Sequence, residues 1–249
     1  MMYRTILSRL SVLPLALMMA LCIMLASCSK DPEPEVIRFS ILGDSYSAFK
    51  GYVDPETNDA WPYYENIGVT EVGQMWWQQL MDSTGWQLER NNSFSGALIG
   101  NYDYLEYYGK HSFLRRMDDL GDPNVIFIFG GANDVWREVA LGDDIFEGWT
   151  EDQLCSFRPA LAYLFDQLKS LYPQATLLFV LDTRLGLDAP LYVSEEHSGA
   201  FVSSIREIAA HYNIACIDVY DIPKEWGHPN VDGQKSIADQ VIAFVETLF

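Results

Sequence analysis

Three short, uninterrupted apolar segments constrain the fold of this chain more than any other feature. They are residues 125–129 (Val-Ile-Phe-Ile-Phe), 177–181 (Leu-Leu-Phe-Val-Leu) and 214–217 (Ile-Ala-Cys-Ile). Each is shorter than an ordinary helix, and apolar residues at every position are typical of strands that are covered on both faces. Such strands occur in parallel sheets that pack between helices. The three segments therefore predict the centre of a parallel sheet.

Two more strands and three helices complete the predicted pattern. Residues 36–42 form an apolar first strand, and residues 86–91 alternate apolar and polar side chains as a strand with one wetter face does. Apolar stripes at helical spacing follow at 159–171, 205–209 and 237–248. Strands that alternate with helices predict an α/β fold, a three-layer α/β/α sandwich around a five-stranded parallel sheet. Ligands bind such sheets beyond the carboxyl ends of the strands.

The N-terminal segment has the features of an export signal. Arg4 and Arg9 precede an uncharged apolar run at residues 10–26, and the run ends in Leu-Ala-Ser followed by Cys28. This ending resembles the lipobox of bacterial lipoproteins, which implies cleavage before Cys28 and attachment of a lipid to its sulfur. An ordinary secretory signal and an uncleaved anchor are the alternatives. We therefore expect a signal peptide at 1–27, an acidic tether at 28–35 and a folded domain at 36–249.

The predicted location follows from that signal. A lipid on Cys28 would hold the protein at a bacterial membrane outside the cytoplasm, with the outer membrane expected and either the periplasm or the cell surface as the facing side. The chain carries 16 basic and 35 acidic residues, a formal charge of −19, so it repels polyanions and is not expected to bind nucleic acid. Cys155 and Cys216 lie in apolar segments, where buried thiols are expected and a disulfide is the alternative.

Polar motifs follow the predicted strands. Gly43-Asp44-Ser45 comes after the first strand, Gly96 lies in the loop after the second, and Gly131-Ala132-Asn133-Asp134 follows the third. His228 precedes the last helix. Glycine lets a backbone approach a ligand closely, and serine with histidine is a pairing used in nucleophilic catalysis. The Gly-x-Ser-x-Gly signature of α/β-hydrolases does not occur.

Taken in this order, the four motifs resemble those of the SGNH hydrolase (GDSL esterase/lipase) superfamily, over residues 36–249. The resemblance implies a flavodoxin-like sandwich and ester hydrolysis through an acyl-enzyme. Ser45 would be the nucleophile and His228 its base. The backbone N–H groups of Ser45 and Gly96 and the side-chain amide of Asn133 would form the oxyanion hole. No HExxH, GxGxxG or Cys/His cluster occurs, so neither a metal nor a cofactor is expected.

One motif departs from the family pattern. The family usually has an aspartate three residues before the histidine, whereas this chain has Glu225 there. We expect Glu225 to orient His228. Asp218 and Asp221 are alternative carboxylates, and a Ser-His pair assisted by a backbone carbonyl is the remaining alternative.

The predicted function is that of a serine esterase that removes short acyl groups, such as acetyl, from carbohydrate. A lipase, a lysophospholipase and a thioesterase are alternatives within the same chemistry. A non-catalytic surface lipoprotein that binds glycans is the alternative from another class. The expected partners are an ester substrate and, through Cys28, a membrane; no oligomeric state is predicted.

Overall fold

A five-stranded parallel sheet forms the centre of the protein. The computed structural model describes residues 36–53, 64–102, 111–189 and 192–249, which lie in one unit, Val36–Phe249. The strands are β1 (Arg38–Gly43), β2 (Gln87–Ser93), β3 (Val125–Phe129), β4 (Thr176–Asp182) and β5 (Ala215–Val219). All neighbours pair in parallel, in the order β2-β1-β3-β4-β5. The predicted fold class and the five predicted strands are confirmed.

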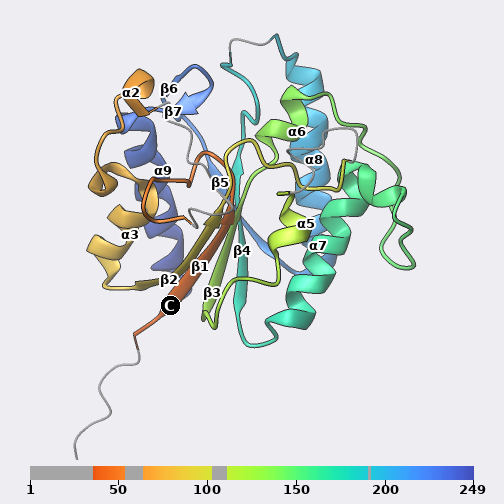
Figure 1. Ribbon diagram of the computed structural model, residues 1–249, viewed down its shortest axis with the longest axis horizontal. Coiled ribbons are helices and arrows are strands. Elements are labelled where there is room, and N and C mark those ends of the chain that lie inside the picture. Colours follow the sequence, from red (N-terminus) through yellow and green to blue (C-terminus); the bar gives the residue numbers. More distant parts are fainter. Residues whose placement is uncertain (1–35, 54–63, 103–110, 190–191) are drawn as a thin grey trace, which may run out of the picture. The chain divides into compact units, whose positions relative to one another are not determined.

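Helices cover both faces of the sheet (Figure 1). On one side α3 (Trp76–Thr84) packs against α9 (Val231–Val245), with α2 (Tyr64–Ile67) and the 3-10 turn η1 (Val72–Gln74) nearby. The other side carries α5 (Phe113–Arg116), α6 (Ala132–Trp136), α7 (Phe157–Leu171) and α8 (Glu195–Tyr212), with the 3-10 turn η2 (Gln153–Cys155) preceding α7. A small antiparallel hairpin, β6 (Lys224–Glu225) and β7 (His228–Pro229), precedes α9.

The predicted helices exist, but their boundaries differ from those of the apolar stripes, most of all at the start of α8. Helix α8 begins at Glu195, ten residues before its predicted start. The apolar stripe did not reveal this part of the helix, because the first residues of α8 are polar. Ser194 caps the helix by accepting a hydrogen bond from the backbone N–H of His197. The negative charge of Glu195 stabilises the first turn, because it lies at the positive end of the helix dipole. At the C-terminus, Leu248 lies beyond α9 and is half exposed, so it does not belong to the helical stripe as predicted.

The strand order places the site. The chain passes from β1 to the edge strand β2 and then to β3 on the opposite side of β1, so the direction of winding reverses between β1 and β3. In a doubly wound sheet the ligand crevice lies outside the carboxyl ends of the strands at this point. Ser45 follows β1 directly and Asn133 lies in the first turn of α6 after β3. The predicted nucleophile and amide therefore flank the crevice.

The remaining sequence expectations divide by region. Cys155 in η2 and Cys216 in β5 form no disulfide with each other, and both are half-buried rather than buried as expected. The signal peptide, Cys28 and the tether at 28–35 lie outside the described residues. Within the described part of the chain, no helix has the length and apolar character needed to cross a membrane.

Candidate active site

Ser45 is held in a tight turn at the end of β1. Gly43 leaves no room for a side chain, since a Cβ atom there would lie 2.6 Å from Oγ of Ser93 on β2. The Asp44 carboxylate accepts a hydrogen bond from the N–H of Tyr46 at 2.9 Å, and the Asp44 carbonyl accepts one from Ser47 at 3.2 Å. The turn thus fixes Ser45 at the rim of the sheet, with 5% of its surface exposed.

His228 lies beside this serine. Its Nε2 atom is 3.1 Å from Oγ of Ser45, and its Nδ1 atom is 3.1 Å from the carbonyl oxygen of Trp226. A carbonyl oxygen can only accept a hydrogen bond, so Nδ1 carries the proton in the neutral ring. Nε2 then presents its lone pair to the serine hydroxyl. This is the tautomer that general-base catalysis requires.

The surroundings of His228 favour its neutral form. Burial lowers the pKa of His228 below its ordinary value of 6.5, because the protein interior disfavours the imidazolium. The hydrogen bond to the Trp226 carbonyl raises this pKa and the nearby positive charge of Lys224 lowers it, and the net shift is downward. The imidazole is therefore available as a base at neutral pH.

The three carboxylates considered from the sequence do not contact the imidazole. Glu225 is exposed on β6, in register with His228 on β7, but the Nδ1 position is occupied by the Trp226 carbonyl. Asp218 is ion-paired with Arg206 at 2.9 Å, and Asp221 is exposed beyond β5. The structure thus pairs the backbones of Glu225 and His228 but does not bring the Glu225 carboxylate to the imidazole, as the main expectation requires, and it shows the contact of the carbonyl-assisted alternative.

The His228 hairpin is anchored on two sides. Lys224 forms an ion pair with Asp182 at the end of β4, with 2.5 Å between Nζ and Oδ2 and only 2% of each side chain exposed. The Tyr46 hydroxyl donates to the carbonyl oxygen of Gly227 at 2.7 Å. These contacts tie the His228 hairpin to the sheet and to the turn that carries Ser45.

The expected oxyanion-hole residues meet around Asn133. Its Nδ2 atom lies 3.2 Å from Oδ2 of Asp44 and 3.1 Å from the carbonyl oxygen of Ala97. Asp44 precedes Ser45 and Ala97 follows Gly96, so the side-chain amide contacts the neighbours of both expected backbone donors. Gly96 adopts a φ of +83°, a conformation that favours glycine. Three strand ends are thereby joined at one point.

Buried carboxylates support this arrangement and were not anticipated from the sequence. Burial raises the pKa of Asp44 to about 7, against the opposing effects of the Tyr46 N–H, Arg116 and Asn133. Burial likewise raises the pKa of Asp134 to about 8, although Ile99 and Tyr102 donate hydrogen bonds to its carboxyl. In the sequence, these aspartates stand out only as members of the strand-end motifs. Their burial and raised pKa values depend on tertiary packing, which the sequence does not show.

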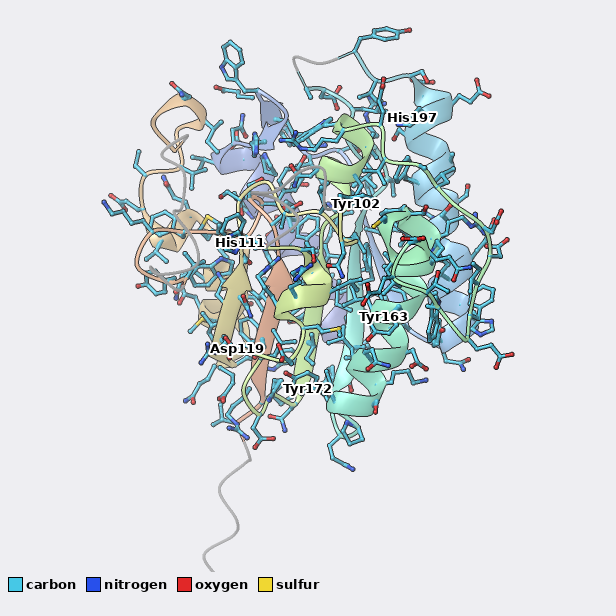
Figure 2. All side chains as sticks on the ribbon, turned by 45° about the vertical axis from the view of Figure 1, so that its right-hand side comes forward. Tyr102, His111, Asp119, Tyr163, Tyr172 and His197 are labelled. Atoms are coloured by element: carbon cyan, nitrogen blue, oxygen red, sulfur yellow. The ribbon has the colours of Figure 1, made fainter. Side chains whose placement is uncertain are left out.

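The buried Arg116 connects the loop at His111 to the turn that carries Ser45. Figure 2 shows Tyr102 and His111 toward the carboxyl ends of the strands, with Asp119 and Tyr172 toward the opposite end. The carbonyl oxygen of His111 accepts a hydrogen bond from Nε of the buried Arg116 at 2.7 Å. Arg116 also donates to the carbonyl oxygen of Gly43 at 3.1 Å, which connects this loop to the nucleophile turn.

Comparison with known proteins decides the family. The model of the GDSL-like lipase/acylhydrolase family matches residues 37–245. The chain belongs to this family. Its membership makes the chain a hydrolase of the GDSL type, and the nucleophile turn with its nearby histidine is what such a hydrolase requires.

Solved structures of GDSL-type proteins resemble this one. A protein from Bacteroides ovatus, described as a GDSL-like lipase, is 42% identical, with a TM-score of 0.75 over 85% of this chain and 99% of its own. A second such protein, from Bacteroides uniformis, is 40% identical, with a TM-score of 0.74 over 85% and 96%. A family two carbohydrate esterase from Clostridium thermocellum, solved with a cello-oligosaccharide, shares the fold at 13% identity and a TM-score of 0.54, over 86% and 65%. No curated protein matches the chain.

Proposed function

We propose that the protein is a serine esterase that works through a Ser45-His228 pair. The contact of 3.1 Å between Oγ and Nε2, with Nδ1 bonded to a carbonyl, is the observation that carries the proposal. Oγ attacks the ester carbonyl carbon while Nε2 takes the hydroxyl proton. The same proton passes to the departing alcohol as the acyl-enzyme forms. Water, deprotonated by His228, then attacks the acyl carbon. The bond from that carbon to Oγ breaks, the proton passes from His228 to Oγ, and the acid leaves.

The negative oxygen of the tetrahedral intermediate needs hydrogen-bond donors. In this proposal, the backbone N–H groups of Ser45 and Gly96 and the Asn133 amide supply them. The position of Asn133 beside the neighbours of Ser45 and Gly96 supports the assignment. Both hydrogens of its amide are bonded, to Asp44 and to Ala97, so the amide must exchange one of these bonds for the oxyanion. Loss of one such donor costs about 100- to 1000-fold in rate.

A labelling experiment tests the nucleophile. We expect a fluorophosphonate probe to modify Ser45, as located by mass spectrometry, and Ser45→Ala to abolish both labelling and ester hydrolysis. Asn133→Ala is expected to retain the fold, shown by circular dichroism, and to lose at least about two orders of magnitude in kcat. Modification of a different serine in the wild-type protein would refute the proposed nucleophile.

The space beside Ser45 suits a short acyl group. A pocket that includes Ser45 and His228 is lined by Ile67, Val69, Met75, Pro229 and Gln234 and holds about 10 Å³. One ordered water molecule needs about 10–15 Å³. An acetyl methyl is of about this size and meets mostly apolar side chains, so we expect a longer chain to require movement of the pocket walls. We propose acetyl as the acyl group.

Chain-length selectivity tests the acyl pocket. The ratio of kcat/KM for p-nitrophenyl acetate to that for the butyrate ester is expected to exceed 1 and to fall in Met75→Ala, which enlarges the pocket. Met81→Ala on α3 is the matched control, because Met81 packs against the core without lining the pocket. A preference for butyrate or longer esters in the wild-type protein would favour a lipase or lysophospholipase instead.

We extend the proposal to carbohydrate as the alcohol part of the substrate. Proteins described as carbohydrate esterases share this fold. Release of acetate from acetylated oligosaccharides, measured against acetylated phospholipid and thioester analogues, tests this step. Hydrolysis of the thioester or lipid analogues alone would contradict it.

We also propose that the mature protein is a lipoprotein anchored through Cys28. A basic segment, an apolar run and a Leu-Ala-Ser-Cys ending follow one another in the sequence, and this order supports the proposed anchor. Metabolic labelling with an alkynyl fatty acid should mark the wild-type chain and leave Cys28→Ala unmarked. Membrane retention of the wild-type chain without any label would support an uncleaved anchor instead.

A further inference from the structure

The turn that joins β6 to β7 places a tryptophan where the backbone disfavours one. Glu225 pairs with His228, so Trp226 and Gly227 are the two central residues of the hairpin. Their φ angles are +54° and +78°. A two-residue hairpin with both central φ angles positive is a type I′ turn, in which Asn-Gly is the strongly preferred sequence. Trp226 therefore occupies a strained position in the left-handed region.

Packing does not explain this tryptophan. Its surface is 69% exposed, in contrast to the buried Trp76 and Trp77 of α3. Among the described residues, its ring stacks on no aromatic side chain and its indole N–H donates no hydrogen bond. What the fold uses is the carbonyl oxygen, which any residue would provide. The large side chain is left without a structural role in the described part of the chain.

The position of Trp226 relative to the reaction indicates what its side chain meets. Nε2 of His228 delivers a proton to the departing alcohol, so the alcohol part of an ester lies next to the imidazole. The backbone carbonyl of Trp226 accepts a hydrogen bond from the other nitrogen of that ring, at 3.1 Å. Two residues of the same hairpin, His228 and Pro229, line the pocket beside Ser45. The hairpin whose turn carries Trp226 therefore borders the centre from which the alcohol departs.

We propose that the exposed side chain of Trp226 is a binding platform for the sugar ring that carries the ester. An indole face packs well against the C–H surface of a pyranose, and exposure leaves that face accessible to a ligand. The strained turn places the platform two residues before the proposed catalytic imidazole. The proposal rests on the proposed function in one respect, since it takes the alcohol to be a carbohydrate.

Trp226→Asn separates the side chain from the backbone contact. Asparagine suits the left-handed conformation and retains the carbonyl that holds Nδ1, so the thermal midpoint should stay equal or rise. We expect the ratio of kcat/KM on acetylated xylo-oligosaccharides to kcat/KM on ethyl acetate, whose alcohol has no ring, to fall about tenfold. Trp226→Tyr should retain most of the oligosaccharide activity. Tyr220→Asn, which removes another exposed aromatic ring, should change neither substrate.

Each other outcome has a defined meaning. Equal losses on both substrates would show that Trp226 only positions His228, and no loss on either would remove the platform; both overturn the inference. If the wild-type protein hydrolyses neither ester, the proposed function fails. Calorimetric binding of deacetylated xylo-oligosaccharide then tests the platform by itself. Binding that is lost in Trp226→Asn supports the platform, and binding that is absent or unchanged by the substitution refutes it.

Discussion

The imidazole of His228 is oriented by the carbonyl oxygen of Trp226, which lies 3.1 Å from Nδ1. A carbonyl fixes the tautomer as a carboxylate does, because it accepts only from a protonated Nδ1. It carries no full negative charge, however, so it stabilises the imidazolium formed during attack less than an ionised partner would. In the proposed mechanism, the rate therefore depends more on the preformed geometry of Ser45 and His228.

Glu225→Gln tests this arrangement directly. Since the carboxylate is exposed and does not contact the imidazole, we expect kcat/KM on p-nitrophenyl acetate to stay within about threefold of the wild-type value. Asp221→Asn is the matched control on a neighbouring exposed carboxylate. A loss of about 100-fold or more in Glu225→Gln, with an unchanged thermal midpoint, would instead assign the glutamate to the catalytic centre.

Much of this site could be predicted from the sequence, and the missing part has a physical cause. The apolar strands at 125–129 and 177–181 predicted the sheet, and the strand-end motifs singled out Ser45, Asn133 and His228. Of these, the structure brings Ser45 and His228 within hydrogen-bond distance. The partner of Nδ1 could not be derived, because it depends on the path of a two-residue turn rather than on residue type. The Asp182–Lys224 pair joins residues 42 positions apart, with no local pattern to reveal it.

The activity should persist into mildly acidic solution. Catalysis needs neutral His228, and burial lowers the pKa of this residue below 6.5. The rate therefore falls as pH drops through that lowered pKa, so the acid limb of kcat/KM should have its midpoint below pH 6.5. The rate of fluorophosphonate labelling at Ser45 should follow the same limb. A midpoint at or above 6.5 in both measurements would contradict a base that is desolvated without a carboxylate partner.

The Lys224–Asp182 pair should be important for stability. Lys224→Met leaves the Asp182 carboxylate buried without its partner, which typically costs about 3–5 kcal/mol of unfolding free energy. Replacement of both residues, Lys224→Met with Asp182→Leu, removes the unpaired charge and should recover a large part of that loss. Urea denaturation of the two single variants and the double variant measures this coupling. Additive losses in the double variant would show that the pair is not coupled.

The buried Asp44 should make the protein less stable at alkaline pH. Its pKa in the folded protein is raised to about 7, whereas an unfolded aspartate has a pKa near 3.8, so the folded state binds the proton more tightly. The resulting stabilisation is fully present below about pH 4 and is lost as pH rises through about 7. Asp44→Asn is uncharged at every pH, so its thermal midpoint should fall less than that of the wild-type protein between pH 5 and pH 9. Asp134, with a pKa of about 8, contributes a loss in the same direction, so part of the wild-type slope should remain in the variant. If the thermal midpoints of the two proteins fall equally between pH 5 and pH 9, Asp44 is already ionised in the folded state at neutral pH.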